Sequence, residues 1–168
     1  GNAIAGEKLL HPNDDVNMSQ SSNDTFPTAM HIAAVLSLES KVLPAIDVLT
    51  AAFLRLEEEN RGIVKSGRTH LQDATPIAFS QEISGWRTSL ERDKALIALS
   101  LDPLRELALG GTAVGTGLNA PKGFDTLVAQ KITALTGKKF VTAPNKFHAL
   151  TSKDELVFAH GALKALAA

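Results

Sequence analysis

The chain has 168 residues, of which 44% are hydrophobic and 21% are charged, and its formal net charge is −1. This composition is typical of a globular chain that can bury a core, and the balanced charge does not indicate the long basic surface of a nucleic-acid-binding protein. The absence of cysteine excludes disulfides, thiolate metal sites and cysteine nucleophiles, and no apolar run approaches the roughly 20 residues needed to cross a bilayer.

The first third of the chain predicts two apolar helices separated by a proline. Gly1–Asn17 shows little periodicity and predicts mainly a loop. Asn23 and Asp24 are good N-cap residues, so a helix is expected to begin there. Residues 29–38 are apolar at nearly every position, which indicates a helix buried on all sides. Pro44 is expected to end or kink it, and beyond Pro44 the apolar residues repeat at three-to-four spacing, as in a bundle seam.

A long polar connection precedes the next helix. Residues 63–74 predict a linker, and its length for a compact helical protein favours a functional role. Thr75-Pro76 predicts the start of a helix. Apolar residues between Phe79 and Leu101 share one face of that helix, and Asp102-Pro103 is expected to end or kink it.

The last third predicts a glycine-rich loop followed by shorter helices. Leu109–Gly123 contains five glycines, too many for a helix interior. Phe124–Leu135 predicts a helix closed by Gly137, Phe140–Leu150 predicts an irregular segment, and Ser152–Glu155 has the spacing of a capping box that starts the last helix. No alternating strand pattern is longer than a few residues. The predicted fold is therefore all-α, a bundle of long helices completed by other chains.

The polar stretch Arg68–Ala74 lies between two helical segments and carries groups that suit a carboxylate. His70 can act as an acid or a base because its charge changes near neutral pH. A place just before a helix start would also put His70 and Thr69 beside backbone N–H groups that favour an anion. The alternative is a histidine that only hydrogen-bonds the loop.

A second polar run, Ser19–Thr25, opens the earlier helix. Ser21, Ser22 and Asn23 offer hydroxyls and an amide where unpaired backbone N–H groups favour an anion. Simple N-capping explains one of these residues and leaves the other two unexplained. We expect the two polar runs, brought together in an assembly, to form part of a pocket for a small dicarboxylate.

Two further motifs give weaker signals. His11–Asp14 has one histidine and a carboxylate without the spacing of metal ligands, so no metal site is predicted. A surface turn is the default interpretation, and a second anion-binding site is the alternative. The glycine-rich run has neither the GxGxxG nor the GxxxxGK[ST] arrangement, so its glycines are expected to permit tight turns rather than to bind a nucleotide.

Taken together, five segments resemble class II fumarases of the fumarase/aspartase superfamily. They run in family order through most of the chain: HPNDDVN at His11–Asn17, SQSSNDTFPT at Ser19–Thr28, GRTHLQDATP at Gly67–Pro76, LGGTAVGTGLN at Leu109–Asn119 and APNKF at Ala143–Phe147. Within the superfamily, Ser22 and His70 favour fumarase over aspartase. His148 departs from the pattern, which has glutamate there.

The resemblance implies the reversible addition of water to fumarate, giving L-malate in the citric acid cycle, without a metal or organic cofactor. His70 would be the catalytic residue that handles the proton. The residues that would bind the substrate carboxylates are Ser21, Ser22, Asn23 and Thr69. The residues that would form a second, non-catalytic anion site are His11, Pro12, Asn13 and Asp14.

The resemblance also implies a homotetramer whose active sites are shared between subunits, without a nucleic-acid or membrane partner. A cytoplasmic location is expected, or a mitochondrial one in a eukaryote. Residues 1–168 are expected to be a central fragment of the lyase domain, truncated at both ends and inactive alone, because the family's upstream SGT segment and downstream serine loop would lie outside it. Two alternatives stay open: an aspartate ammonia-lyase type of enzyme from the same superfamily, and a catalytically silent helical scaffold like the crystallin relatives.

Overall fold

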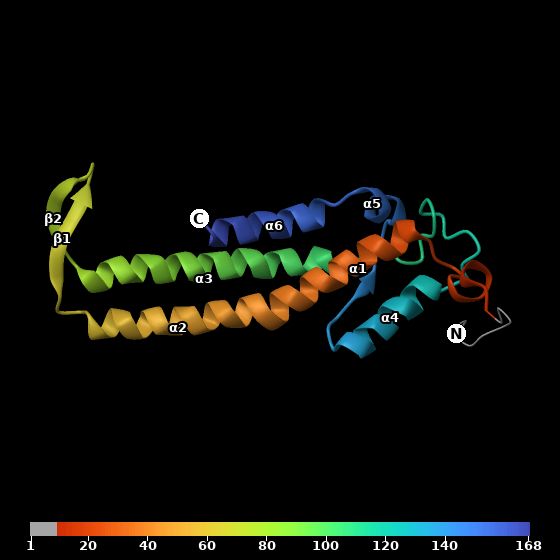
Figure 1. The fold of residues 1–168 in the computed structure, drawn as a ribbon, viewed down its shortest axis with the longest axis horizontal. Helices are drawn as coiled ribbons and strands as arrows, with labels where there is room; N and C mark the ends of the chain where they lie inside the picture. Colours follow the sequence, from red (N-terminus) through yellow and green to blue (C-terminus); the bar gives the residue numbers. More distant parts are fainter. Residues whose placement is uncertain (1–9) are drawn as a thin grey trace. The chain divides into compact units, whose positions relative to one another are not determined.

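A computed structural model describes residues 10–168, and the chain forms two compact units. Unit 1 comprises the described residues up to Leu36 together with Asp102–Val157, and unit 2 comprises Ser37–Leu101 together with Phe158–Ala168. Most of the described residues are helical (Figure 1), which confirms the predicted fold class. Within the described residues, no helix is both long enough and apolar enough to cross a membrane.

Unit 1 holds short elements joined by turns. They are the π-helical turn η1 (Pro12–Val16), helix α1 (Ser22–Ser37), strand β3 (Glu106–Leu107), helix α4 (Phe124–Thr136), strand β4 (Val141–Thr142), helix α5 (Lys146–Thr151) and the first turn of α6 (Asp154–Leu166). Strands β3 and β4 pair in parallel. Leu107 on β3 is 1% exposed, and Leu104, Ala129 and Phe140 of the same unit are also buried.

Several boundaries in unit 1 agree with the predictions. Helix α4 follows Gly123 and ends at Gly137, whose φ of 65° is the left-handed conformation that closes many helices. The segment 109–123 forms turns, as its glycines indicate. The expectation that Phe140–Leu150 is irregular is wrong, because β4 and α5 lie there. Helix α5 starts where the Asn145 side chain accepts a hydrogen bond from the His148 N–H at 3.0 Å.

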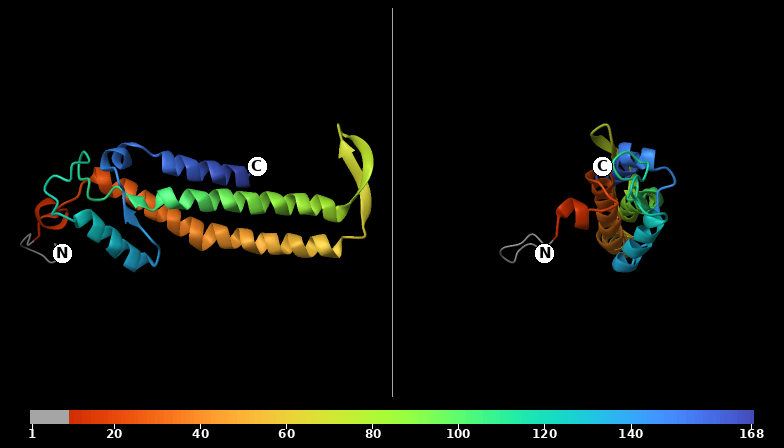
Figure 2. Two further views of the ribbon diagram at one scale, coloured as in Figure 1. Left: turned by 180° about the vertical axis from the view of Figure 1, so that it is seen from behind. Right: turned by 90° about the vertical axis from the view of Figure 1, so that its right-hand side faces the viewer.

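Unit 2 is built on a pair of long antiparallel helices. Its elements are the π-helical turn η2 (Leu38–Val42), helix α2 (Leu43–Glu59), strands β1 (Val64–Thr69) and β2 (Gln72–Ala78), helix α3 (Phe79–Leu104) up to Leu101, and α6 from Phe158 onward. The expected interruption near Pro44 takes the form of η2, which comes directly before α2. Figures 1 and 2 show α3 lying beside both α2 and this part of α6.

Polar and aromatic contacts fix the pairing of α2 with α3. Arg87 on α3 donates from Nε to Glu57 Oε2 on α2 at 2.8 Å. The Phe53 and Trp86 rings lie 6.1 Å apart between centroids, and Lys94 pairs with Asp47 further along. The predicted apolar face of α3 is confirmed in part: its buried members are Ile83, Ile97 and Leu101, whereas Trp86 remains 48% exposed.

The expected linker over residues 63–74 and the helix start at Thr75-Pro76 are both wrong. These residues form an antiparallel hairpin at the end of the α2–α3 pair (Figure 1), and α3 begins only at Phe79. Ser66 pairs with Pro76, and the register shifts at Gly67. A Cβ atom at Gly67 would approach the Thr75 carbonyl oxygen to 2.6 Å, so the glycine permits the close approach of the two strands.

Candidate functional site

The entrance of α1 is a modified capping box. The Ser21 N–H donates to Asp24 Oδ1 at 2.8 Å, and Ser21 Oγ accepts a hydrogen bond from the Asn23 N–H at 3.2 Å. In a standard capping box, the serine side chain bonds the backbone N–H three residues later, and the acidic side chain at that position bonds the serine N–H. Here Asp24 makes the second of these bonds, whereas the Ser21 side chain bonds the N–H of Asn23, two residues later. The sequence predicts the helix start within two residues, although it does not predict this exchange.

Asp24 also holds the glycine-rich turn, a contact that the sequence analysis missed. Its side chain is completely buried, and Oδ2 accepts hydrogen bonds from the Gly110 N–H at 3.0 Å and the Thr112 N–H at 2.8 Å. One helical turn further along α1, Thr28 Oγ1 accepts from the Leu109 N–H at 3.0 Å. The Ser-x-x-Asp spacing from Ser21 to Asp24 is the local signal that could have identified Asp24.

A half-buried ammonium group supports the other side of the same turn. Lys146 Nζ donates to the Leu107 and Leu109 carbonyl oxygens at 2.7 and 2.9 Å and to Thr142 Oγ1 at 2.5 Å. Burial lowers the pKa of Lys146, and the negative charges of Asp125 and Asp24 offset part of that effect. Burial alone would raise the pKa of Asp125, but hydrogen bonds from Thr142 and from backbone N–H groups, with the charge of Lys146, leave this pKa below its ordinary value.

Two of the cavities beside the α1 entrance are lined by Ser21. One, of about 580 Å³, is lined by Asp14, Asn17, Met18, Ser19, Gln20, Ser21, Thr112, Ala113, Leu118 and Asn119. The other, of about 560 Å³, is lined by Asn17, Gln20, Ser21, Ser22 and Thr25. Both are within the usual size of small-molecule sites. Hydroxyl groups of Ser21 and Ser22 therefore border open space, and the Asn23 amide lies near them, donating to the Ala113 carbonyl oxygen at 2.8 Å.

The His11–Asp14 segment forms the start of η1 in place of the expected loop. The His11 N–H donates to Asp15 Oδ2 at 2.7 Å, and His11 Nδ1 accepts a hydrogen bond from the Asp14 N–H at 3.2 Å. Asp14 also lines the larger cavity. The Asp15 carboxylate accepts from the His11 N–H, and His11 Nδ1 accepts from the Asp14 N–H, so an anion that uses either donor has to replace one of these acceptors.

Thr69 and His70 belong to unit 2, at the tip of the hairpin. Thr69 pairs with Gln72, which leaves His70 and Leu71 as a two-residue turn with φ values of 50° and 61°. Positive φ at both positions is typical of a type I′ turn, in which Asn-Gly is the preferred pair. Both Thr69 and His70 are exposed. The structure thus brings Ser21, Ser22 and Asn23 together in unit 1 and places the other two candidates on a separate element.

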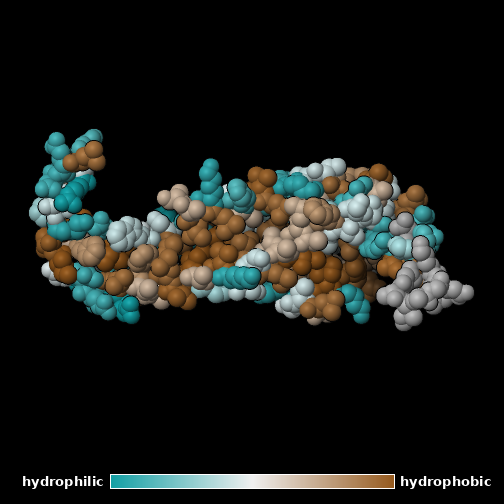
Figure 3. All heavy atoms as spheres, in the orientation of Figure 1, coloured by the Kyte–Doolittle hydropathy of each residue, from teal (hydrophilic) through white to brown (hydrophobic). Residues whose placement is uncertain are grey.

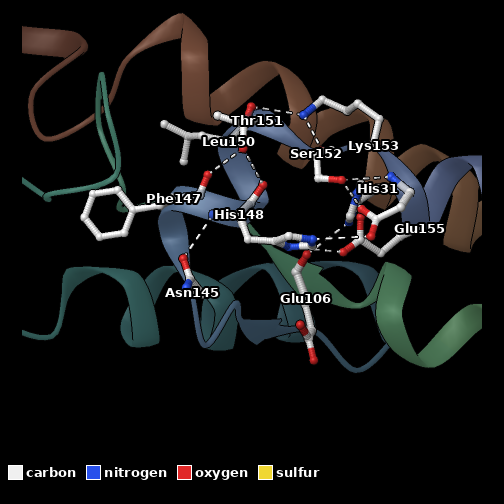
Figure 4. Close-up of polar contacts among 11 residues, drawn as sticks. His31, Glu106, Asn145, Phe147, His148, Leu150, Thr151, Ser152, Lys153 and Glu155 are labelled. Carbon is white, nitrogen blue, oxygen red and sulfur yellow. Dashed lines mark hydrogen bonds and ion pairs between the residues drawn. The ribbon is translucent and has the colours of Figure 1, made fainter.

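A third group of polar residues joins α5 to the start of α6 (Figure 4). His148, to which the sequence assigns no role, lies 3.3 Å from Asp154 Oδ2 through Nε2 and 3.7 Å from Glu155 Oε1 through Nδ1. A hydrogen bond from Ser152 is the largest of the effects that lower the pKa of Asp154 to about 2. Candidate ligand atoms of His148, Asp154 and Glu155 lie within 4.8 Å of one another. Exposed acidic groups often gather in this way without a metal ion, so we interpret the cluster as ion pairs.

Comparisons with known proteins give one family. The family model described as Lyase matches residues 1–168. The fumarate hydratase class II of Oceanobacillus iheyensis is 63% identical over 159 residues, which are 95% of this chain and 34% of that protein. The fumarate hydratase class II of Helicobacter pylori strain J99 is 57% identical over 168 residues, which are 100% of this chain and 36% of that protein.

Solved structures give the same picture. The crystal structure of a class II fumarase from Schistosoma mansoni matches with a TM-score of 0.94 and 38% identity, over 99% of this chain and 38% of that chain. A fumarate lyase:delta crystallin from Brucella melitensis bound to cobalt matches with a TM-score of 0.89 and 37% identity, over 95% of this chain and 35% of that chain. The chain thus spans about a third of the length of the curated relatives that it matches.

Proposed function

Because this chain belongs to the lyase family whose model matches residues 1–168, we propose that the complete protein is a class II fumarate hydratase. It adds the hydrogen and the hydroxyl of water to the two double-bonded carbons of fumarate, giving L-malate, and it also catalyses the reverse reaction. The observation that carries the proposal is the identity of 55–63% to fumarate hydratases along 95–100% of the chain.

The proposed roles follow the chemistry of the residues. Ser21, Ser22 and Asn23 bind substrate carboxylates through hydroxyl and amide donors, and Thr69 contributes another hydroxyl. His70 handles the proton. Taking a proton from the carbon next to a carboxylate builds negative charge on that carboxylate, and donors fixed beforehand stabilise this charge. The cavities that Ser21 and Ser22 line support the assignment.

His11, Pro12, Asn13 and Asp14 are proposed to form a second, non-catalytic anion site. The cavity that Asp14 and Ser21 both line supports a position close to the substrate-binding serines. An anion there would compete with the Asp15 carboxylate and with His11 Nδ1 for the backbone N–H donors of this segment. We expect such a site to bind weakly.

The active enzyme is proposed to be a homotetramer in the cytoplasm, with active sites shared between subunits, serving the citric acid cycle without a cofactor. Exposed apolar side chains on the long helices of unit 2 support the assembly: Val48, Leu49, Leu54, Trp86, Leu96 and Leu99. Figure 3 shows apolar residues over the middle of this helix pair. Such a surface favours burial against other helices.

The test measures fumarate and L-malate interconversion by the purified complete protein and its His70→Asn variant. If His70 transfers a proton, its loss should lower kcat by about 10²–10⁴-fold with little change in KM. The matched control is His160→Asn, the same change at an exposed position on α6, which should leave kcat unchanged.

Three results would contradict the proposal. An unchanged kcat in His70→Asn would remove this residue from the mechanism. Ammonia release from aspartate without fumarate hydration would support the ammonia-lyase alternative. A correctly assembled protein without either activity would support a silent scaffold.

A further inference from the structure

We propose that Asp24 is a positioning residue for the dicarboxylate substrate, because its buried carboxylate joins the Ser21–Asn23 cradle to the glycine-rich turn 109–112. This inference rests on the proposed function, since it assigns the cradle to a substrate carboxylate. Asp24 itself is buried completely beneath the helix entrance. It acts through the residues that it holds.

The hydrogen bonds of Asp24 divide between two segments that are far apart in the sequence. Oδ1 accepts from the Ser21 N–H at the mouth of α1, and Oδ2 accepts from the Gly110 and Thr112 N–H groups. The Asn23 amide adds a bond to the Ala113 carbonyl oxygen, next to the same turn. One carboxylate therefore sets the distance between the helix entrance and the turn. Ser21 of the entrance and Thr112 of the turn both line the larger cavity.

Helix capping alone does not require such a residue. A buried carboxylate is costly unless hydrogen bonds and charges compensate it, and an exposed aspartate or serine caps a helix without that cost. Here three backbone N–H groups compensate Asp24, and its charge acts on Lys146. A need to hold the cradle at a fixed position relative to the turn would explain why a buried carboxylate is present here.

Thr28 provides the matched comparison. It lies one helical turn further along α1, is 3% exposed, and accepts a hydrogen bond from the same turn through the Leu109 N–H. This hydrogen bond joins Thr28 to Leu109 and not to Ser21, so Thr28 supports the turn without reaching the cradle. A residue that only stabilises the fold should behave like Thr28, whereas a positioning residue should also change substrate binding.

The isosteric change Asp24→Asn separates the two roles. An asparagine has one acceptor oxygen, and its NH₂ group would face N–H donors at the other position. Either the Ser21 N–H or the pair at Gly110 and Thr112 then loses its acceptor. The cradle and the turn shift relative to each other, which displaces the Ser21 and Ser22 hydroxyls. We assign the cradle to the substrate carboxylate that gains no charge in the reaction, and groups that bind such a carboxylate equally in ground and transition states act on KM more than on kcat.

The experiment compares the complete wild-type protein with Asp24→Asn and Thr28→Val. The wild-type protein is assayed first, because an absence of fumarate turnover would contradict the proposed function. The ratio between the KM values of Asp24→Asn and Thr28→Val then tests the role of Asp24. Both variants should lower Tm. Asp24→Asn should raise KM for fumarate and for L-malate by about tenfold or more with kcat within about threefold, and Thr28→Val should leave KM within about twofold.

Two further measurements complete the test. Calorimetry with succinate, a four-carbon dicarboxylate that cannot be hydrated, should show weaker binding to Asp24→Asn by a similar factor and unchanged binding to Thr28→Val. If Asp24→Asn does not accumulate as folded protein, Asp24→Glu keeps the carboxylate but moves it by one methylene, and the same rise in KM is expected. Equal KM values in both variants, or a loss of Tm in Asp24→Asn without a change in KM, would overturn the proposal.

Discussion

Replacing Leu71 by glycine should stabilise unit 2, although the change removes a leucine side chain. Leu71 is 102% exposed and has a φ of 61°, so its side chain contributes no burial while its backbone is strained. The left-handed conformation costs an ordinary residue about 1–2 kcal/mol, and glycine loses about 0.5–1 kcal/mol through the entropy of the unfolded chain. The difference predicts a gain of about 0.5–1 kcal/mol in the free energy of unfolding.

Urea unfolding of the chain, followed by the fluorescence of Trp86, measures this change. The matched control is Leu99→Gly, because Leu99 is also exposed, at 64%, but lies inside α3. A glycine in a helix interior costs about 1 kcal/mol, so the same substitution should have the opposite sign. If both variants lose stability equally, the hairpin turn does not hold Leu71 at positive φ in solution, and the argument for a strained tip fails.

Two further predictions concern the glycine-rich turn and the start of α6. Gly110 has a φ of 99°, and a Cβ atom there would approach Asp125 Cβ to 2.4 Å. Gly110→Ala should therefore lower the free energy of unfolding, measured by urea titration, by about 2–5 kcal/mol. The control Gly62→Ala, with open space around the position, should change it by less than about 1 kcal/mol. The folded-state pKa of Asp154 is lowered from 3.8 to about 2, so its stabilising contribution is present above pH 3.8 and is lost as the pH falls toward 2. Asp154→Asn should abolish that part of the acid dependence of Tm. An unchanged dependence of Tm on pH would contradict this role of Asp154.

Several helix positions followed from local signals, although the start of α3 and the presence of α5 did not. The spacing of apolar residues between Phe79 and Leu101 and the glycine at position 137 each mark a feature that the structure confirms. These signals lie within one helix, so they need no knowledge of distant contacts. Pro44 gave a correct location for an interruption, but the sequence could not show that η2 would accommodate it as a π-helical turn.

The hairpin was missed because it lacks both usual signals of a hairpin. Its strands are exposed on both faces, except near Gly67, so no alternation of apolar and polar residues appears. Its turn is His70-Leu71 instead of the preferred Asn-Gly, and leucine seldom adopts positive φ. A histidine and a leucine held there indicate that something other than turn propensity selected them, and strained positions of this kind concentrate at functional sites.

The candidate site was predictable only where its residues are neighbours in sequence. Ser21, Ser22 and Asn23 stood out as a polar cluster at a helix start, and they line or adjoin the cavities there. Asp24 and Lys146 did not, because their partners lie far along the chain: Gly110 and Thr112 follow Asp24 by more than 80 residues. Periodicity and capping rules describe one element at a time and cannot identify such contacts.

The electrostatics of unit 1 give Lys146 a role in the proposed binding site, although it does not border either cavity. Two unit charges 4 Å apart interact by about 4 kcal/mol near a protein surface, so an uncompensated Asp24 would repel a dicarboxylate bound at Ser21 and Ser22. The interaction of Asp24 with Lys146 and its three backbone hydrogen bonds reduce that repulsion. Asp24 can then fix the geometry of an anion site while being an anion itself, provided that the Lys146 ammonium group stays charged and in place beneath the turn.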